Sequence, residues 1–133
     1  MSINLVSVLV ATIAGMLLGA FWYSPIAFGK AWMESLGKTE TELGSPVIPM
    51  VCSILASLAT ALALAIVLSM TGVTSIADGA VVGAIIGFGI VFTALLSDNL
   101  FCGWGAKLLL IQSGYRVLYV IVMASIISAW PGQ

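Results

Sequence analysis

Four long stretches that are almost free of charge limit what this chain can fold into. Each is about 20 residues long or longer, which is the length that a helix needs to cross a bilayer. The first two contain no charged residue, the third contains Asp98 near its end, and the fourth contains Arg116 near its start. The sequence therefore predicts a polytopic membrane protein with four spans: Ile3–Trp22, Val47–Met70, Gly79–Phe101, and a fourth that starts between Leu108 and Ser113 and runs to Trp130.

The composition agrees with this class and excludes several others. Of the 133 residues 62% are hydrophobic and 7% charged, whereas about a quarter of a soluble domain is charged. Histidine is absent, which excludes Ser-His and Cys-His nucleophile pairs and imidazole ligands. The net charge of −1 leaves no basic face for nucleic acid. Cys52 and Cys102 form no paired motif of the zinc or redox type. We therefore expect no cofactor, no metal and no nucleic-acid partner, and a lipid bilayer as surroundings.

Proline and tryptophan residues support the same division into spans. A proline costs little at a helix end, where an N–H group has no partner in any case, and tryptophan favours the headgroup region. All eight such residues fall at span ends or in loops: Pro25, Pro46, Pro49, Pro131, Trp22, Trp32, Trp104 and Trp130. The expected fold is an all-α integral membrane protein, a bundle of four transmembrane helices forming a single domain over residues 1–133.

The first loop contains a further helical pattern. Phe28, Trp32 and Leu36 recur at every fourth position. Lys30 and Glu34 lie on another face of the same helix. This pattern predicts a short interfacial helix between the first and second spans, with its aromatic side in the acyl boundary. It is interpreted first as an anchor, and a partner-docking surface is the alternative.

Small residues recur at every fourth position in all four spans, and glycine forms such stripes in two of them. Gly15 and Gly19 are four residues apart in the first span, and Gly79, Gly83 and Gly87 repeat that spacing in the third. Such stripes let helix backbones approach closely in lipid. Packing within one four-helix bundle is the preferred interpretation. A homo-oligomer seam or a glycine-lined pore is the alternative.

The basic residues predict the orientation. Lys30 and Lys38 lie in the first loop, and Lys107 and Arg116 lie in or beside the third. The positive-inside rule places these loops in the cytoplasm. Both termini are then expected to be extracytoplasmic.

Asp98 and Arg116 are the most informative polar residues of the spans. With a third span ending near Phe101 and a fourth starting near Ser113, both charges lie at one depth, and a lone charge there is costly. We therefore expect them to interact. In the alternatives, Arg116 extends towards headgroups while Asp98 faces water, or Asp98 titrates at a cavity mouth.

A resemblance to a known family rests on a turn after the first span. Trp22, Tyr23, Ser24 and Pro25, followed by Phe28, Gly29, Lys30 and Trp32, resemble the opening signature of a bacterial membrane family, domain of unknown function 1761 (DUF1761). The stretch 108–115 and the closing Trp130 are similar to the last helix of that family. Where members often have Leu-Phe-Glu after the third helix, this chain has Leu100-Phe101-Cys102. The resemblance implies a four-helix protein of the bacterial inner membrane and brings no activity, cofactor or substrate.

These observations favour a non-enzymatic accessory or structural membrane protein that acts through helix–helix contacts. A small homo-oligomeric transporter or channel is the alternative. An enzyme ranks last, because no nucleophile–base pair, metal cluster or pair of carboxylates is evident. A polar-walled cavity reaching the middle of the membrane would favour transport.

Overall fold

The computed structural model describes residues 2–131, and every regular element in that range is a helix. The short helix α2 lies between the first and second long helices, as expected, and is followed by a single turn, η1. The bounds are α1 Leu5–Trp22, α2 Gly29–Leu36, η1 Glu40–Leu43, α3 Val47–Thr71, α4 Ile76–Ile86, η2 Gly87–Phe92, α5 Thr93–Cys102 and α6 Ala106–Ala129.

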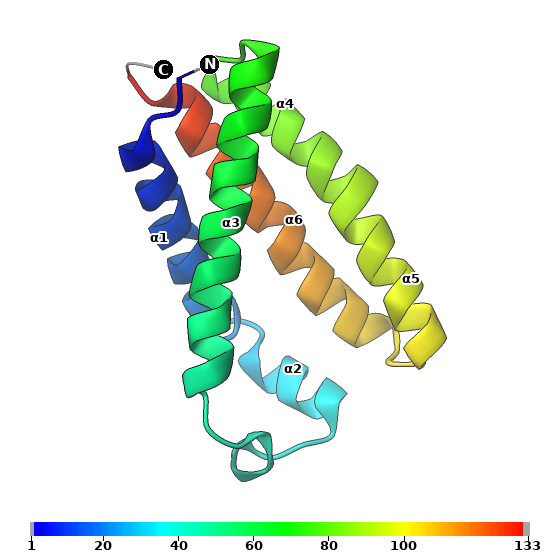
Figure 1. The fold of residues 1–133 in the computed structure, drawn as a ribbon. Coiled ribbons are helices and arrows are strands. Elements are labelled where there is room, and N and C mark those ends of the chain that lie inside the picture. Colours follow the sequence, from blue (N-terminus) through cyan, green and yellow to red (C-terminus); the bar gives the residue numbers. More distant parts are fainter. Residues whose placement is uncertain (1, 132–133) are drawn as a thin grey trace.

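Four helical segments are long and apolar enough to cross a membrane. They are α1, α3, the continuous segment Ile76–Cys102 that joins α4, η2 and α5, and α6. The predicted all-α fold with four membrane helices is therefore confirmed. The start of α1 and the end of α6 lie at one end of the molecule, beside the α3–α4 connection, while α2 lies at the opposite end (Figure 1). Which end faces the cytoplasm stays a prediction.

The last helix lies at the centre of the fold. In an apolar 18-residue stretch of α6 half of the residues are buried, compared with 17% in such a stretch of Ile76–Cys102. Its small, aromatic and aliphatic residues pack on α1, α3 and α4. The fold is therefore organised around α6, with the other long helices arranged about it (Figure 1).

Both glycine stripes face this central helix within the same chain. A Cβ atom added at Gly15 would lie 2.6 Å from Cε2 of Tyr119, and one added at Gly83 would lie 2.7 Å from the Cα of Ile121. Gly19, Gly79 and Gly87 likewise lie against Tyr115, Ser128 and Val117. Glycine is needed here because any side chain would push the helices apart.

Two helices separate from the bundle at the α2 end. The first buried residue of α3 is Ser57, ten positions after its start at Val47. In α5 the buried residue is Asn99, and its Nδ2 donates to the carbonyl of Gly105 at 3.1 Å in the loop that leads to α6. The bundle is therefore tightly packed near the termini and more open near α2.

The start of α6 differs from the expectation. The helix begins at Ala106, after a loop in which Gly103 and Gly105 have positive φ. A helix start placed at the apolar run from Leu108 onwards therefore makes the helix too short. Lys107 can belong to a membrane helix because its ammonium group can stay in water. As a result, Arg116 lies ten residues past the helix start and not three.

Candidate functional site

The signature turn folds α2 back towards α6. The indole Nε1 of Trp22 donates to the carbonyl of Ile111 at 2.9 Å, which fixes the end of α1 on α6. The amide of Phe28 donates to the carbonyl of Trp22 at 2.9 Å, and the two rings lie 4.6 Å apart. Gly29 is buried, and a Cβ atom there would overlap the backbone carbonyl of Tyr23.

Other signature residues stabilise the same turn. The amide of Gly29 donates to the carbonyl of Ser24 at 2.9 Å, and the hydroxyl of Ser24 donates to the carbonyl of Phe21 at 2.6 Å. Pro25 and Lys30 are exposed. Ser24 and Gly29 therefore shape the backbone, whereas Lys30 faces outwards.

A row of aromatic rings runs from α2 into the bundle. The ring of Trp32 lies 5.1 Å from that of Tyr23, which lies 5.5 Å from the ring of Tyr115. The ring of Tyr119 continues the row at 5.4 Å. The hydroxyl of Tyr115 donates to the carbonyl of Gly15 at 3.0 Å and so fixes the row on α1.

Arg116 lies beside this row. Its guanidinium carbon is 5.1 Å from the ring centroid of Tyr115 and 5.3 Å from that of Tyr119, which is the range of a cation–π interaction. The side chain is half-buried. Within residues 2–131, no oxygen atom accepts a hydrogen bond from it and no carboxylate pairs with it.

The expected pair of Asp98 and Arg116 is not formed. Asp98 is exposed on α5, whereas Val117, the residue after Arg116, packs against Gly87 of η2. Since neighbouring helical residues point about 100° apart, Arg116 is turned away from the third span and towards α1 and α3. The earlier start of α6 also places it deeper than expected.

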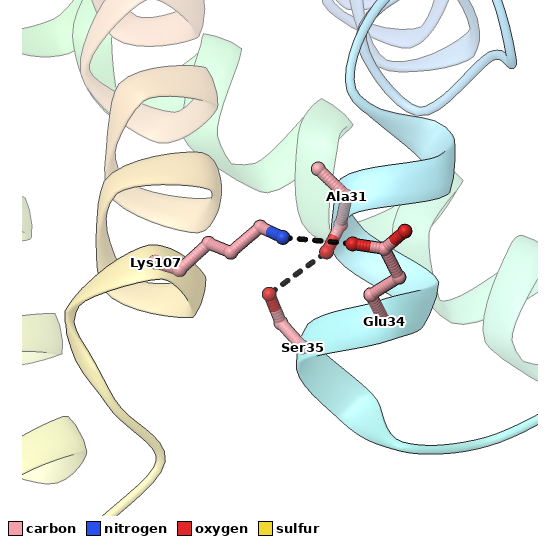
Figure 2. Close-up of polar contacts among 4 residues, drawn as sticks. All are labelled: Ala31, Glu34, Ser35 and Lys107. Atoms are coloured by element: carbon pink, nitrogen blue, oxygen red, sulfur yellow. Dashed lines mark hydrogen bonds and ion pairs between the residues drawn. The ribbon is translucent and has the colours of Figure 1, made fainter.

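The ion pair in the described part of the chain joins α2 to α6 instead. The Nζ of Lys107 lies 2.9 Å from Oε2 of Glu34 (Figure 2). The hydrogen bond and the positive charge of Lys107 lower the pKa of the Glu34 carboxyl below its ordinary value. Sequence reasoning missed this pair because its partners are 73 positions apart. Both side chains are largely exposed, so the pair adds little stability.

A cavity of about 590 Å³ opens between these elements. Its floor and walls come from α1, α2, the start of α3 and α6. At the deep end the hydroxyl of Ser57 lies 3.3 Å from the sulfur of Met16. The lining contains the Arg116 cation and no carboxylate: Met16, Leu17, Gly19, Ala20, Tyr23, Trp32, Pro46, Pro49, Met50, Ser53, Ser57, Tyr115 and Arg116.

Two of the residues that line this cavity have polar groups of particular interest. The indole Nε1 of Trp32 is buried and has no partner among the described residues. Burial raises the pKa of Tyr23 to about 12, against a smaller opposing effect of the Arg116 charge. The Tyr23 hydroxyl therefore stays protonated at neutral pH and can donate. Together with the Arg116 guanidinium, these groups form a site suited to an anion.

The other cavities are less suited to a charged ligand. One, of about 490 Å³, lies between Phe88 and Phe92 of η2 and the middle of α6, and no charged side chain lines it. Within residues 2–131 no cluster of three potential metal-ligating side chains occurs. Cys52 and Cys102 are exposed and free.

Comparison with known proteins gives a family and no activity. The sequence profile described as "Protein of unknown function (DUF1761)" matches residues 6–128, a range that includes nearly all of the four membrane helices and the whole lining of the cavity. No curated protein matches the chain significantly, and neither does any solved structure. The chain belongs to the DUF1761 family of proteins of unknown function.

Proposed function

We propose that this protein is a non-enzymatic accessory protein of the membrane, whose packed helices hold a binding site for an anionic ligand. Helix–helix contacts build the scaffold, because both glycine stripes are used within the chain to pack α1 and α4 on α6. The ligand site is the cavity beside Arg116.

One observation carries the proposal: a cation without a counter-ion lines a cavity whose other polar groups are neutral hydroxyl and indole groups. An unpaired charge in a membrane segment is costly and usually marks a functional site. Binding is favoured over catalysis because the lining has hydroxyl groups but no carboxylate or imidazole to activate them.

A thermal-stability series tests the proposal. The purified protein in dodecyl maltoside is heated with dodecyl phosphate or with dodecyltrimethylammonium, which share one chain length and differ in head charge. A ligand that binds only the folded state raises the Tm, so dodecyl phosphate should raise it more than the cation does. Arg116→Gln should abolish the difference, while Lys30→Gln, which removes an exposed cation outside the cavity, should keep it. Equal Tm values with both amphiphiles would contradict the proposal.

The alternative is a small homo-oligomeric transporter or channel. The depth of the cavity favours this alternative, since the cavity extends from Pro46 at the start of α3 to Ser57, ten residues into that helix. Proteoliposomes that contain a fluorescent phosphatidylglycerol in the inner leaflet distinguish the two functions. An accessory binder leaves the lipid in its leaflet and chemically intact. Arg116-dependent movement to the outer leaflet would assign transport, and a new lipid product would assign an enzyme.

A further inference from the structure

We propose that the ligand of the Arg116 cavity is an anionic phospholipid, which enters from the bilayer through the gap between α1 and α3. This inference rests on the proposed function and adds the chemical class of the ligand and its route. It is carried by the shape of the opening, by the level of Arg116 in the fold and by the set of donors.

The cavity opens towards the outside of the helix bundle, between α1 and α3. Leu17 of α1 is 65% exposed and Met50 of α3 is 52% exposed, and both line the cavity. The gap exists because α3 packs on its neighbours only from Ser57 onwards. A spanning helix presents such side chains to lipid, so an acyl chain can lie along them while the headgroup is inside.

The level of Arg116 suits a phosphate group near the membrane surface. Trp22, at the end of α1, bonds to the carbonyl of Ile111. Arg116 is five residues further along α6, which is roughly 7.5 Å inside the level at which α1 ends. A long arginine side chain can direct its charge towards the headgroup region from this depth. A lipid phosphate therefore needs to move inwards by only a few ångströms.

The polar groups of the cavity favour a lipid headgroup that has a phosphate and no positively charged group. A guanidinium group binds phosphate oxygens through two parallel N–H donors, and Trp32 and Tyr23 are among the residues that line the same cavity. The Arg116 cation already lies near the rings of Tyr115 and Tyr119. Because a second cation would be repelled there and no carboxylate lines the cavity, a choline headgroup is disfavoured relative to a glycerol headgroup.

Native mass spectrometry of the detergent-solubilised protein tests the inference. Phosphatidylglycerol and phosphatidylcholine with the same acyl chains are added separately, and the lipid-bound fraction is measured against lipid concentration. We expect phosphatidylglycerol to bind at least about tenfold more tightly, and Arg116→Gln to remove most of that preference, because a charged hydrogen-bonding partner is lost. Lys30→Gln is the control for a change in net charge.

Two further variants test the site and its entrance while Arg116 stays unchanged. Trp32→Phe removes the indole N–H and retains a ring beside Tyr23, and it should weaken phosphatidylglycerol binding roughly two- to tenfold. Leu17→Trp narrows the gap and should weaken lipid binding, whereas Leu9→Trp, at an exposed position of α1 outside the cavity, should not. Full binding by both Trp32→Phe and Leu17→Trp would overturn the proposed site and entrance.

Water-soluble anions separate the inference from the proposed function. Inorganic phosphate and glycerol 1-phosphate are used as competitors of phosphatidylglycerol at equal concentrations. If either anion competes as strongly as an equal concentration of phosphatidylglycerol, the cavity remains an anion site but the lipid is overturned as its ligand. Equal binding of phosphatidylglycerol and phosphatidylcholine, together with no Tm response to dodecyl phosphate, would overturn both the lipid ligand and the proposed anion-binding function.

Discussion

Replacing Gly83 by alanine should destabilise the packing of α4 on α6. The new Cβ atom would lie 2.7 Å from the Cα of Ile121, 3.1 Å from the Cβ of Ala124 and 3.1 Å from the carbonyl oxygen of Val120. Two of these atoms belong to the backbone of the central helix, and the third is a Cβ atom bonded directly to that backbone. The two helices must therefore separate by several tenths of an ångström along their contact.

Gly89 provides a matched control on the same continuous helical segment. No atom lies within 4 Å of a Cβ added there. Overpacking a tight contact costs about 1–3 kcal/mol, whereas exchanging a helical glycine for alanine gains up to about 1 kcal/mol. Because only Gly83→Ala introduces a close contact, it should be less stable than Gly89→Ala by about 1–3 kcal/mol.

Reversible unfolding in mixed micelles of dodecyl maltoside and sodium dodecyl sulfate, followed by circular dichroism, measures this difference. The Gly83→Ala variant should unfold at the lower fraction of sodium dodecyl sulfate. A Gly83→Ala protein as stable as Gly89→Ala would refute the close packing of α4 on α6. A change in oligomeric mass with unchanged unfolding would instead assign the stripe to a seam between subunits.

Three further predictions concern charged residues. The lowered pKa of Glu34 means that its pair with Lys107 contributes stability above the ordinary carboxyl pKa, and that this contribution is lost as the pH falls through the lowered value. The small Tm difference between wild type and Glu34→Gln should therefore vanish in acid, and a difference that grows in acid would contradict the pair. Asp98→Arg should leave the folded yield near that of wild type, since Asp98 is exposed and not paired with Arg116; rescue of Arg116→Asp by Asp98→Arg would disprove the geometry. A cysteine at position 38 should be protected from an impermeant thiol reagent in intact cells and one in the α3–α4 connection should react, and the reverse pattern would invert the topology.

The membrane helices were predictable because their signal is local. A run of about 20 uncharged residues has few folded forms other than a spanning helix, and the positions of proline and tryptophan marked the ends. The four-residue spacing of Phe28 and Trp32 likewise predicted the helix α2. These features depend on residues that are close in the sequence.

The site was not predictable in the same way, because it depends on how the helices are rotated about their axes. Arg116 stands out in the sequence as a charge within an apolar segment, but its direction follows from the packing of Val117 against Gly87. The meeting of Tyr23 with Tyr115 brings together residues of different spans. Sequence spacing within one helix contains no information on such contacts, although the signature turn already marked Tyr23 and Trp32.

Calorimetric titration of dodecyl phosphate into the detergent-solubilised protein measures anion binding beside Arg116. We expect saturable binding to the wild type and to Lys30→Gln with similar Kd values. For Arg116→Gln we expect binding about tenfold or more weaker, because the charged donor to the phosphate is removed. Binding of equal strength to the wild type and to a folded Arg116→Gln protein would contradict an anion site at Arg116.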